Sequence, residues 1–321
     1  MKRLWASLAF GALIALAGAG AHAQTASGTT RILLGFADEA GYSFAQLISD
    51  NIATAMGQPV VIERRPGATG RIAANALKNA PPDGSTLYLA PIVVPVLAPL
   101  VFHNLSYDPV TDFAPVAQVL TFRYALAVGP NHPARTAQEF IAWAKAHPKE
   151  AAYGTAGAGS VPHFVGVMIN QATGTQLLHV PYKGAAPMLA DLMGDQIASG
   201  IESLTNMIEL HRAGRIRILA VSGAERSPLA PSIPTFREQG LTNVDAVGWV
   251  GVFAPARTPK PVIDRLSAAI VAAVRTQSIR GQYLALGVEP TGTTPEELAA
   301  IVAADTARWA PIIKASRFSA D

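Results

Sequence analysis

Residues 151–163 have the sequence Ala151-Ala152-Tyr153-Gly154-Thr155-Ala156-Gly157-Ala158-Gly159-Ser160-Val161-Pro162-His163. An apolar run, a glycine-rich turn and the start of a helical pattern follow one another here, which predicts a strand, a tight turn and a helix. The same order recurs many times from Thr30 onward. Strands that alternate with helices indicate mainly parallel sheets with helices on their faces. We therefore predict an α/β fold.

The predicted strands fall into two series. The first is Arg31–Phe36, Pro59–Glu63, Thr86–Ala90 and Val116–Val119. The second is Ala151–Thr155, Gln176–Val180, Ile197–Ile201 and Arg217–Val221, interleaved with helices near 136–146, 160–172, 185–193 and 204–212. The chain has 321 residues, more than the ~250–300 at which one core stops growing. Two α/β lobes are the expected architecture.

The C-terminal third has a different pattern, with a strand at Trp249–Phe253 followed by three helices. Pro261–Thr276 has helical spacing after a cap-like Thr258-Pro259, and Thr294-Pro295-Glu296-Glu297 combines a hydroxyl cap with an N1 proline and acids in the first turn. These helices need a sheet to cover, and the first lobe is the expected host. The chain then crosses between lobes near Thr121–Pro130 and Ala246–Ala254. The predicted lobes are 24–122 with 250–321, and 123–249, with a ligand cleft between them.

The composition excludes several classes of protein. Half of the residues are apolar, 15% are charged and the mean hydropathy is +0.27, which is too apolar for a largely disordered chain. The 25 basic and 22 acidic residues form no basic run that would bind nucleic acid. Cysteine is absent, so disulfides and thiolate chemistry are excluded. No His-x-x-x-His pair occurs, and we expect neither a metal nor a cofactor.

The N-terminal segment resembles a secretory signal. Lys2 and Arg3 precede an apolar stretch, Leu4–Ala17, and small residues ending in Ala21-His22-Ala23. This order predicts cleavage after Ala23, with an uncleaved membrane anchor as the alternative. Loss of residues 1–23 would lower the formal net charge from +3 to +1. No later apolar run reaches the ~20 residues of a membrane span, so we predict an exported, periplasmic protein.

The glycine-rich turn at 154–160 is the first candidate site. Unpaired N–H groups and the start of a helix lie together there, and this combination favours an anion. Ser160 stands where a Walker loop needs lysine, and Pro162 where a dinucleotide fingerprint needs its third glycine. The turn could also be purely structural. Ser160 as a hydrolase nucleophile has little support, because no G-x-S-x-G motif surrounds it.

Two further places carry acidic residues. The turn after the first strand, Phe36-Ala37-Asp38-Glu39-Ala40-Gly41-Tyr42-Ser43, would receive an ammonium group or a hydrogen-bond donor, unless both acids face solvent. Glu202 follows the strand at 197–201 and could accept a hydrogen bond from ligand or water, or be a surface carboxylate. Trp249 could line the cleft, although core packing is the more common role of such an aromatic residue.

Six ordered motifs across residues 24–321 resemble the periplasmic substrate-binding proteins of tripartite tricarboxylate transporters, also known as Bordetella uptake-gene (Bug) proteins. The motifs are Gly57-Gln58-Pro59-Val60-Val61-Ile62-Glu63-Arg64-Arg65-Pro66-Gly67-Ala68, Pro82-Asp83-Gly84, Tyr107-Asp108-Pro109-Val110-Thr111-Asp112-Phe113, the 154–160 turn, His179-Val180-Pro181-Tyr182-Lys183-Gly184 and Ala254-Pro255-Ala256-Arg257-Thr258-Pro259. The resemblance implies a two-lobed, periplasmic-binding-protein-like fold that closes on a small carboxylate. It also implies a carrier and not an enzyme, serving a membrane pair driven by an ion gradient.

The resemblance also implies where the ligand binds. In this family the first strand–helix loop, the residues after the third strand, the glycine turn and an acid of the second lobe hold it. With the neighbouring histidine of the turn motif, the candidate positions are Phe36, Ala37, Asp38, Glu39, Gly41, Tyr42, Ser43, Pro91, Ile92, Thr155, Ala156, Gly157, Ala158, Gly159, Ser160, His163 and Glu202.

Two candidate segments depart from the family pattern. Ala37-Asp38-Glu39-Ala40-Gly41 replaces the usual Pro-Pro-Gly-Gly-Gly, and Pro91-Ile92 replaces Thr-Ser. We therefore expect a ligand whose acid end lies on the 154–160 turn and whose other part is less anionic, apolar or amine-bearing.

The predicted function is capture of a small organic acid in the periplasm and its delivery to integral-membrane transporter subunits. We expect no nucleic-acid partner, and we expect the protein to be a monomer. A binding protein that serves a membrane sensor is one alternative. A secreted hydrolase that uses Ser160 with His163 or His179 is the other.

Overall fold

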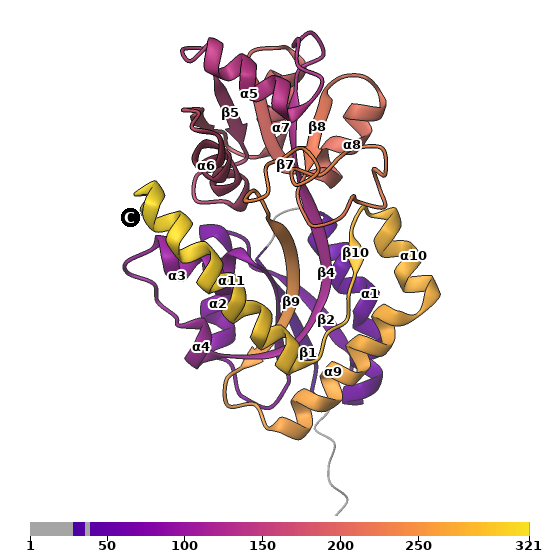
Figure 1. Cartoon of the computed structure of the whole chain (residues 1–321). Helices are drawn as coiled ribbons and strands as arrows, with labels where there is room; N and C mark the ends of the chain where they lie inside the picture. The colour runs from indigo at the N-terminus through magenta and orange to yellow at the C-terminus, as the bar shows by residue number, and fades with distance from the viewer. Residues whose placement is uncertain (1–27, 36–38, 321) are drawn as a thin grey trace, which may run out of the picture.

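The computed structural model describes residues 28–35 and 39–320. Its elements form two groups, a lower and an upper one in Figure 1, and the strands β4 (Phe113–Val128) and β9 (Val247–Pro255) run from one toward the other. The fold is thus mixed α/β, as the sequence predicted.

The lower group contains a mixed sheet with the strand order β2-β1-β3-β9-β4. Its first three strands are parallel to one another, whereas β9 is antiparallel to both β3 and β4. A short strand, β10, also pairs with β4, in antiparallel direction and outside this strand order. The remaining bounds are β1 (Thr30–Leu34), β2 (Val60–Arg64), β3 (Thr86–Pro91) and β10 (Glu289–Pro290).

Helices cover both faces of the lower sheet. On one face, Ile48 of α1 and Leu266 of α9 pack on Ile32 and Leu87 of the sheet, and on the other face α2 and α11 pack on Leu33 and its neighbours. Adjacent strand residues point to opposite faces, which explains why Ile32 and Leu33 enter different cores. The helical elements of this group are α1 (Glu39–Met56), η1 (Ala68–Gly70), α2 (Arg71–Lys78), η2 (Val93–Leu97), α3 (Ala98–Val101), α4 (Pro109–Asp112), α9 (Lys260–Arg275), α10 (Gln277–Ala285) and α11 (Pro295–Ser316).

The upper group is built on the second half of β4. β7 and β8 are antiparallel to β4, and β5 and β6 extend the sheet parallel to β7. The bounds are β5 (Ala152–Thr155), β6 (Leu178–Pro181), β7 (Ser199–Ser203) and β8 (Arg217–Val221), with helices α5 (Ala137–Ala146), α6 (Val161–Thr173), α7 (Ala185–Met193) and α8 (Leu204–Arg212).

The strand directions bring two sheet edges face to face. β4 runs from the lower group into the upper one, and β9 runs antiparallel to it. β3 is antiparallel to β9, so the carboxyl ends of β1, β2 and β3 point toward the upper group. β7 is antiparallel to β4, so the carboxyl ends of β5, β6 and β7 point toward the lower group. Ligands of open α/β sheets bind at such carboxyl ends.

β4 differs most from its prediction. The strand expected at Val116–Val119 extends over Phe113–Val128, and residues 121–128, expected to link the lobes, lie within it. It continues because its partners change along its length: β9 pairs as far as Arg123, and β7 and β8 pair from Tyr124 or Ala125 onward. The lobe limits drawn from the sequence stay a prediction, and this change of partners supports them.

The three C-terminal helices follow the predicted strand Trp249–Phe253 as expected, and the last one contacts the upper group as well as the lower sheet that it was expected to cover. α11 begins with a capping box in which Thr294 and Glu297 satisfy each other's backbone N–H groups. Its end lies beside α6 in Figure 1, and Trp309 packs 6.3 Å from Phe164, centroid to centroid. The largest core therefore runs through both groups of elements, where the sequence had indicated a separate core for each lobe. Thr258 does not cap α9, because its hydroxyl donates to Pro255 O.

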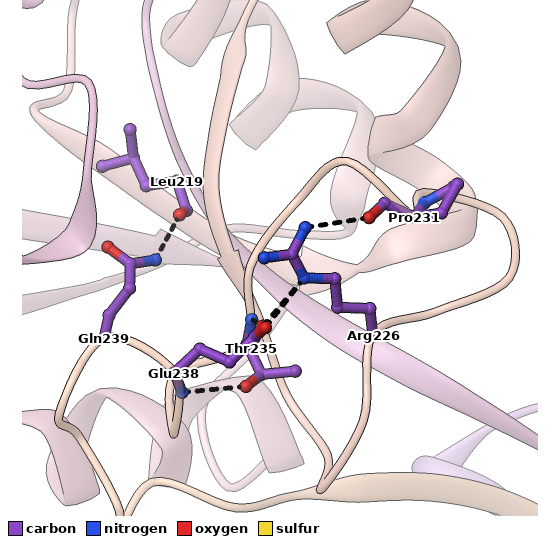
Figure 2. A network of polar contacts seen from close by, with 6 residues as sticks. All are labelled: Leu219, Arg226, Pro231, Thr235, Glu238 and Gln239. Atoms are coloured by element: carbon purple, nitrogen blue, oxygen red, sulfur yellow. Dashed lines mark hydrogen bonds and ion pairs between the residues drawn. The ribbon is translucent and has the colours of Figure 1, made fainter.

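An irregular segment returns the chain from β8 to β9 and is held by a polar network (Figure 2). Arg226 Nε lies 2.9 Å from Glu238 Oε1, and Arg226 Nη1 donates to Pro231 O. Thr235 and Glu238 cap each other's N–H groups, and Gln239 Nε2 donates to Leu219 O at 2.7 Å. These bonds satisfy backbone groups that no helix or strand ladder serves here.

Candidate functional site

The turn between β5 and α6 is set by one glycine and one cap. Gly159 has φ +72°, a conformation that side chains rarely adopt. Ser160 is the N-cap of α6, its Oγ accepts from His163 N, and Pro162 occupies the first turn, where no intrahelical N–H bond is needed. The strand, turn and helix predicted for residues 151–163 are confirmed.

The turn's own side chains bond within it and leave amides open. The hydroxyls of Thr155 and Ser160 both donate to Gly157 O, at 3.1 and 2.7 Å, and Gly159 N donates to His163 Nδ1 at 3.2 Å. Among the described residues, the N–H groups of Ala156, Gly157 and Ala158 have no acceptor. Backbone N–H groups in this arrangement are suited to bind an anion.

Two stacked histidines support the turn. The rings of His163 and His179 lie 4.0 Å apart, and His179 Nε2 is 2.8 Å from Thr155 Oγ1. Burial lowers the pKa of each to about 4, so both are neutral near pH 7. His163 Nδ1 is then free to accept from Gly159. The sequence analysis named His179 as a possible base of a hydrolase and as the first residue of the family motif at 179–184, but not as a support of the turn.

Three helices begin where the upper parallel strands end. α6 follows β5, α7 follows β6, and α8 follows β7 directly. Each helix start carries a partial positive charge, and the three converge on one sheet edge because β5, β6 and β7 are parallel. This electrostatic arrangement attracts a carboxylate.

Glu202 lies at the same edge and is buried. It is 7% exposed and pairs with Ala125 of β4. Its Oε1 accepts from Ser203 N at 2.8 Å, whereas its Oε2 is buried without a partner among the described residues. Burial raises the pKa of this carboxyl above its ordinary value. The alternative of a surface carboxylate is therefore wrong.

The candidate residues of the first turn are only partly described. Phe36, Ala37 and Asp38 lie outside the described residues. The strand predicted to end at Phe36 ends at Leu34, and α1 starts at Glu39, so Gly41, Tyr42 and Ser43 belong to a helix and not to a turn. Phe44, Ile48 and Ile52 recur at helical spacing and are buried, which favours a helix over a longer loop.

Two of these α1 side chains are placed by their neighbours. The Tyr42 ring lies 4.8 Å from the Arg64 guanidinium, measured to the ring centroid. Ser43 lines a cavity of about 600 Å³ between α1 and α10, on the flank of the lower group. Ser43 therefore lines this cavity on the flank and not the edges where the strand ends of the two groups face each other.

Pro91 and Ile92 follow the facing end of β3. Pro91 is the last residue of that strand and is partly exposed. Ile92 is 1% exposed, and its N–H donates to Trp249 O. Trp249 is buried as well, and its Nε1 donates to Asp305 Oδ2 at 2.7 Å, so this aromatic ring is core and does not line a cleft.

The C-terminal tail was missed by the sequence analysis. The Phe318 ring lies 5.0 Å from the His163 ring and edge-on to it, and a Cβ at Gly159 would come within 2.9 Å of Phe318 Cε1. Ala320 N donates to Val101 O beside α3, so the tail touches both groups of elements. A contact between residues so far apart in the chain leaves no local pattern in the sequence.

The described residues offer neither a metal site nor a membrane span. No group of three or more His, Asp or Glu side chains in the described ranges could hold a metal ion. None of the helices described is both long and apolar enough to cross a bilayer. The predicted signal at residues 1–23 lies outside the described residues.

The chain matches one protein family over most of its length. The family model described as the tripartite tricarboxylate transporter family receptor, TctC, matches residues 44–318. Protein BugT of Bordetella pertussis is 30% identical over 271 residues, which are 84% of this chain and 83% of BugT.

Solved structures share the fold. Rpa4515 of Rhodopseudomonas palustris, solved with adipate, is 31% identical and has a TM-score of 0.80 over 89% of this chain and 96% of its own. MatC of the same organism, solved with malate, is 29% identical with a TM-score of 0.76 over 89% and 98% of the two chains.

Proposed function

This chain belongs to the TctC family of tripartite tricarboxylate transporter receptors, and we propose that it captures a small organic acid between its two facing strand edges. It is a periplasmic solute-binding protein. The carboxylate end of the ligand binds the open N–H groups of Ala156, Gly157 and Ala158. The single observation that carries this proposal is the convergence of those amides with the starts of α6, α7 and α8.

Other findings support the same ligand class. The two solved relatives hold adipate and malate, and both are dicarboxylates. The Ser160 hydroxyl donates to Gly157 O and accepts from a backbone N–H, which is the bonding of a helix cap and not of a nucleophile beside a base. We infer that the protein binds and releases its ligand without turnover.

The proposal extends to partners and processing. The receptor delivers its ligand to the integral-membrane subunits of a tripartite transporter, acts as a monomer and loses residues 1–23 on export. The two lobes, 24–122 with 250–321 and 123–249, close on the ligand, and residues 121–130 and 246–254 carry the motion. A ligand that binds the closed state more tightly than the open state shifts a two-lobed protein toward the closed state.

The first test is a binding screen with a matched pair of glycine variants. Adipate, malate, citrate, succinate, benzoate and glutamate are titrated into the mature chain by calorimetry, and we expect at least one of them to bind. Gly159→Ala should lower the affinity for that ligand tenfold or more, because both the backbone conformation (φ +72°) and the Phe318 ring oppose a methyl group there.

Gly174→Ala is the control for this variant. Gly174 ends the same helix with φ +67° and has open space around it, so it carries the same backbone strain away from the site. Gly174→Ala should lose about 1 kcal/mol of stability and Gly159→Ala at least as much, because of the added contact with Phe318, but only Gly159→Ala should lose affinity. Equal binding by the two variants, or no binding of any carboxylate, would contradict the proposal.

A second test concerns the rewritten first loop. We propose that Asp38 and Glu39 face the less anionic or amine-bearing part of the ligand. Asp38→Ala and Glu39→Ala should then each weaken the binding of an amine-bearing acid such as glutamate and strengthen the binding of citrate, because each variant removes one negative charge. Tight citrate binding by the native chain, unchanged in both variants, would refute this ligand class.

A further inference from the structure

We propose that Glu202 takes up one proton when a ligand carboxylate binds, so that its Oε2–H donates a hydrogen bond to the ligand. The proton comes from solvent and returns to it on release. This inference rests on the proposed function, because it needs a carboxylate at the edge formed by β5, β6 and β7. It makes the affinity of the receptor depend on proton concentration.

The register of the sheet places Glu202 beside the open turn. β5 and β7 are parallel, with Gly154 opposite Gly200. β7 continues two residues beyond Gly200 to Glu202, whereas β5 ends at Thr155 and the turn begins there; neighbouring strands lie ~4.8 Å apart. A Cβ at either Gly154 or Gly200 would touch Met188, so both positions face α7. Glu202 follows Gly200 by the strand period of two and shares that face, at the edge of the sheet where the turn begins.

The environment of Glu202 cannot hold two negative charges. Its Oε1 accepts from Ser203 N, and its Oε2 is buried with no hydrogen-bond partner in the part of the chain that the structure describes. No ion pair to Glu202 is found among the described lysines, arginines and histidines. When a second carboxylate arrives at close range in a buried site, one of the pair becomes protonated. The ligand is held by amide N–H groups that favour its ionised form, so Glu202 is the group that takes the proton.

The surrounding elements supply few compensating charges. On β4, Tyr124 is buried near Glu202, so that burial and then the Glu202 carboxyl raise the pKa of that phenol, and Arg123 forms an ion pair with Glu289 of β10. Burial raises the pKa of Glu202 by more than the uncharged Ser203 of β7 and Asn206 of α8 lower it. The neighbouring elements carry further titratable groups: Tyr153 of β5, His163 of α6, Tyr182 before α7 with its acceptor Asp191 on α7, and Glu209, His211 and Arg212 of α8. The raised pKa that burial gives Glu202 before any ligand arrives supports the same direction.

Calorimetry in two buffers measures the proton directly. Adipate and malate are titrated at pH 8 in phosphate and in Tris, whose ionisation enthalpies differ, so the difference in heat gives the protons taken up per ligand. We expect a value approaching one for the native chain. The affinity should fall up to tenfold for each pH unit above the pKa of free Glu202.

The Glu202→Gln variant tests whether Glu202, and not another group, takes up the proton. The amide keeps an acceptor for Ser203 N and supplies a permanent donor in place of Oε2–H. This variant should bind with no linked proton and, at pH 8, more tightly than the native chain. Glu209→Gln is the control, because it makes the same change on α8 at an exposed residue paired with Arg212, and it should match the native chain.

The outcomes separate the two proposals. Binding of adipate or malate without proton uptake by the native chain overturns this inference and leaves the proposed function standing, and this arm does not depend on any variant folding. Proton uptake that persists in Glu202→Gln also overturns it, as does a Glu202→Gln variant that binds more weakly at every pH. No binding of any carboxylate overturns the proposed function and this inference with it.

Discussion

Replacing Gly166 by alanine is expected to lower the free energy of unfolding by about 1–3 kcal/mol, the range for an overpacked core. This loss of stability is the opposite of the usual effect, because alanine in a helix interior is more stable than glycine by about 1 kcal/mol. The reason is contact with β5: a methyl group at Gly166 of α6 would overlap the ring of Tyr153. Tyr153 cannot move aside freely, because it is 1% exposed and its hydroxyl donates to His163 O.

The same substitution should also reduce ligand affinity. Tyr153 and His163 flank the turn at 154–160, so a shift of α6 away from β5 moves the open amides of that turn. We expect adipate or malate to bind at least tenfold more weakly. Urea unfolding gives the stability and calorimetry the affinity.

Gly281→Ala provides the matched control. Gly281 lies inside α10 and a Cβ there meets nothing within 4 Å. This variant should gain about 0.5–1 kcal/mol and bind as the native chain does. If both alanine variants were stabilised alike, the close packing of α6 on Tyr153 would be refuted.

Replacing Trp309 by alanine is expected to cost about 3–5 kcal/mol of stability, as for other fully buried tryptophans. The Trp309 side chain is 0% exposed and belongs to the core that runs through both groups of elements. Its loss removes the contact of α11 with Phe164 of α6. A fall in melting temperature of roughly 10 °C follows for a chain of this size.

Two variants sharpen this test. Trp143→Ala removes the same side chain from α5, where it is only partly buried, and should cost clearly less. Trp309→Phe keeps most of the ring and removes an indole N–H that is buried without a partner among the described residues. It should therefore cost much less than Trp309→Ala. Equal losses for Trp309→Ala and Trp143→Ala in a thermal melt would show that α11 does not tie the two groups together.

Local structure was predictable where a few neighbouring residues decide it. The strand Arg217–Val221 and the helices 185–193 and 204–212 have the predicted limits. Proline and acids after Thr294 predicted the start of α11, and Gly159 with Ser160 predicted the turn before α6. Periodicity, caps and positive φ are properties of short segments, so one sequence is enough to reveal them.

The length of β4 and the burial of Ile92 were not predictable in this way. Residues 121–123 resemble a break between apolar runs, yet they continue the strand because β9 is opposite them. Ile92 was expected to touch a ligand but is covered within the core. In both cases the deciding partner is far away in the chain.

The sequence by itself determined the alternation of strands and helices, the glycine turn with its helix cap, and the family likeness that these motifs carry. The tertiary structure alone decided that two sets of strand ends face each other, that Glu202 is buried with one oxygen unpartnered among the described residues, and that the end of α11 lies beside α6. Dihedral preference and capping act within a few residues. Burial, strand direction and charge compensation arise only when distant segments pack together.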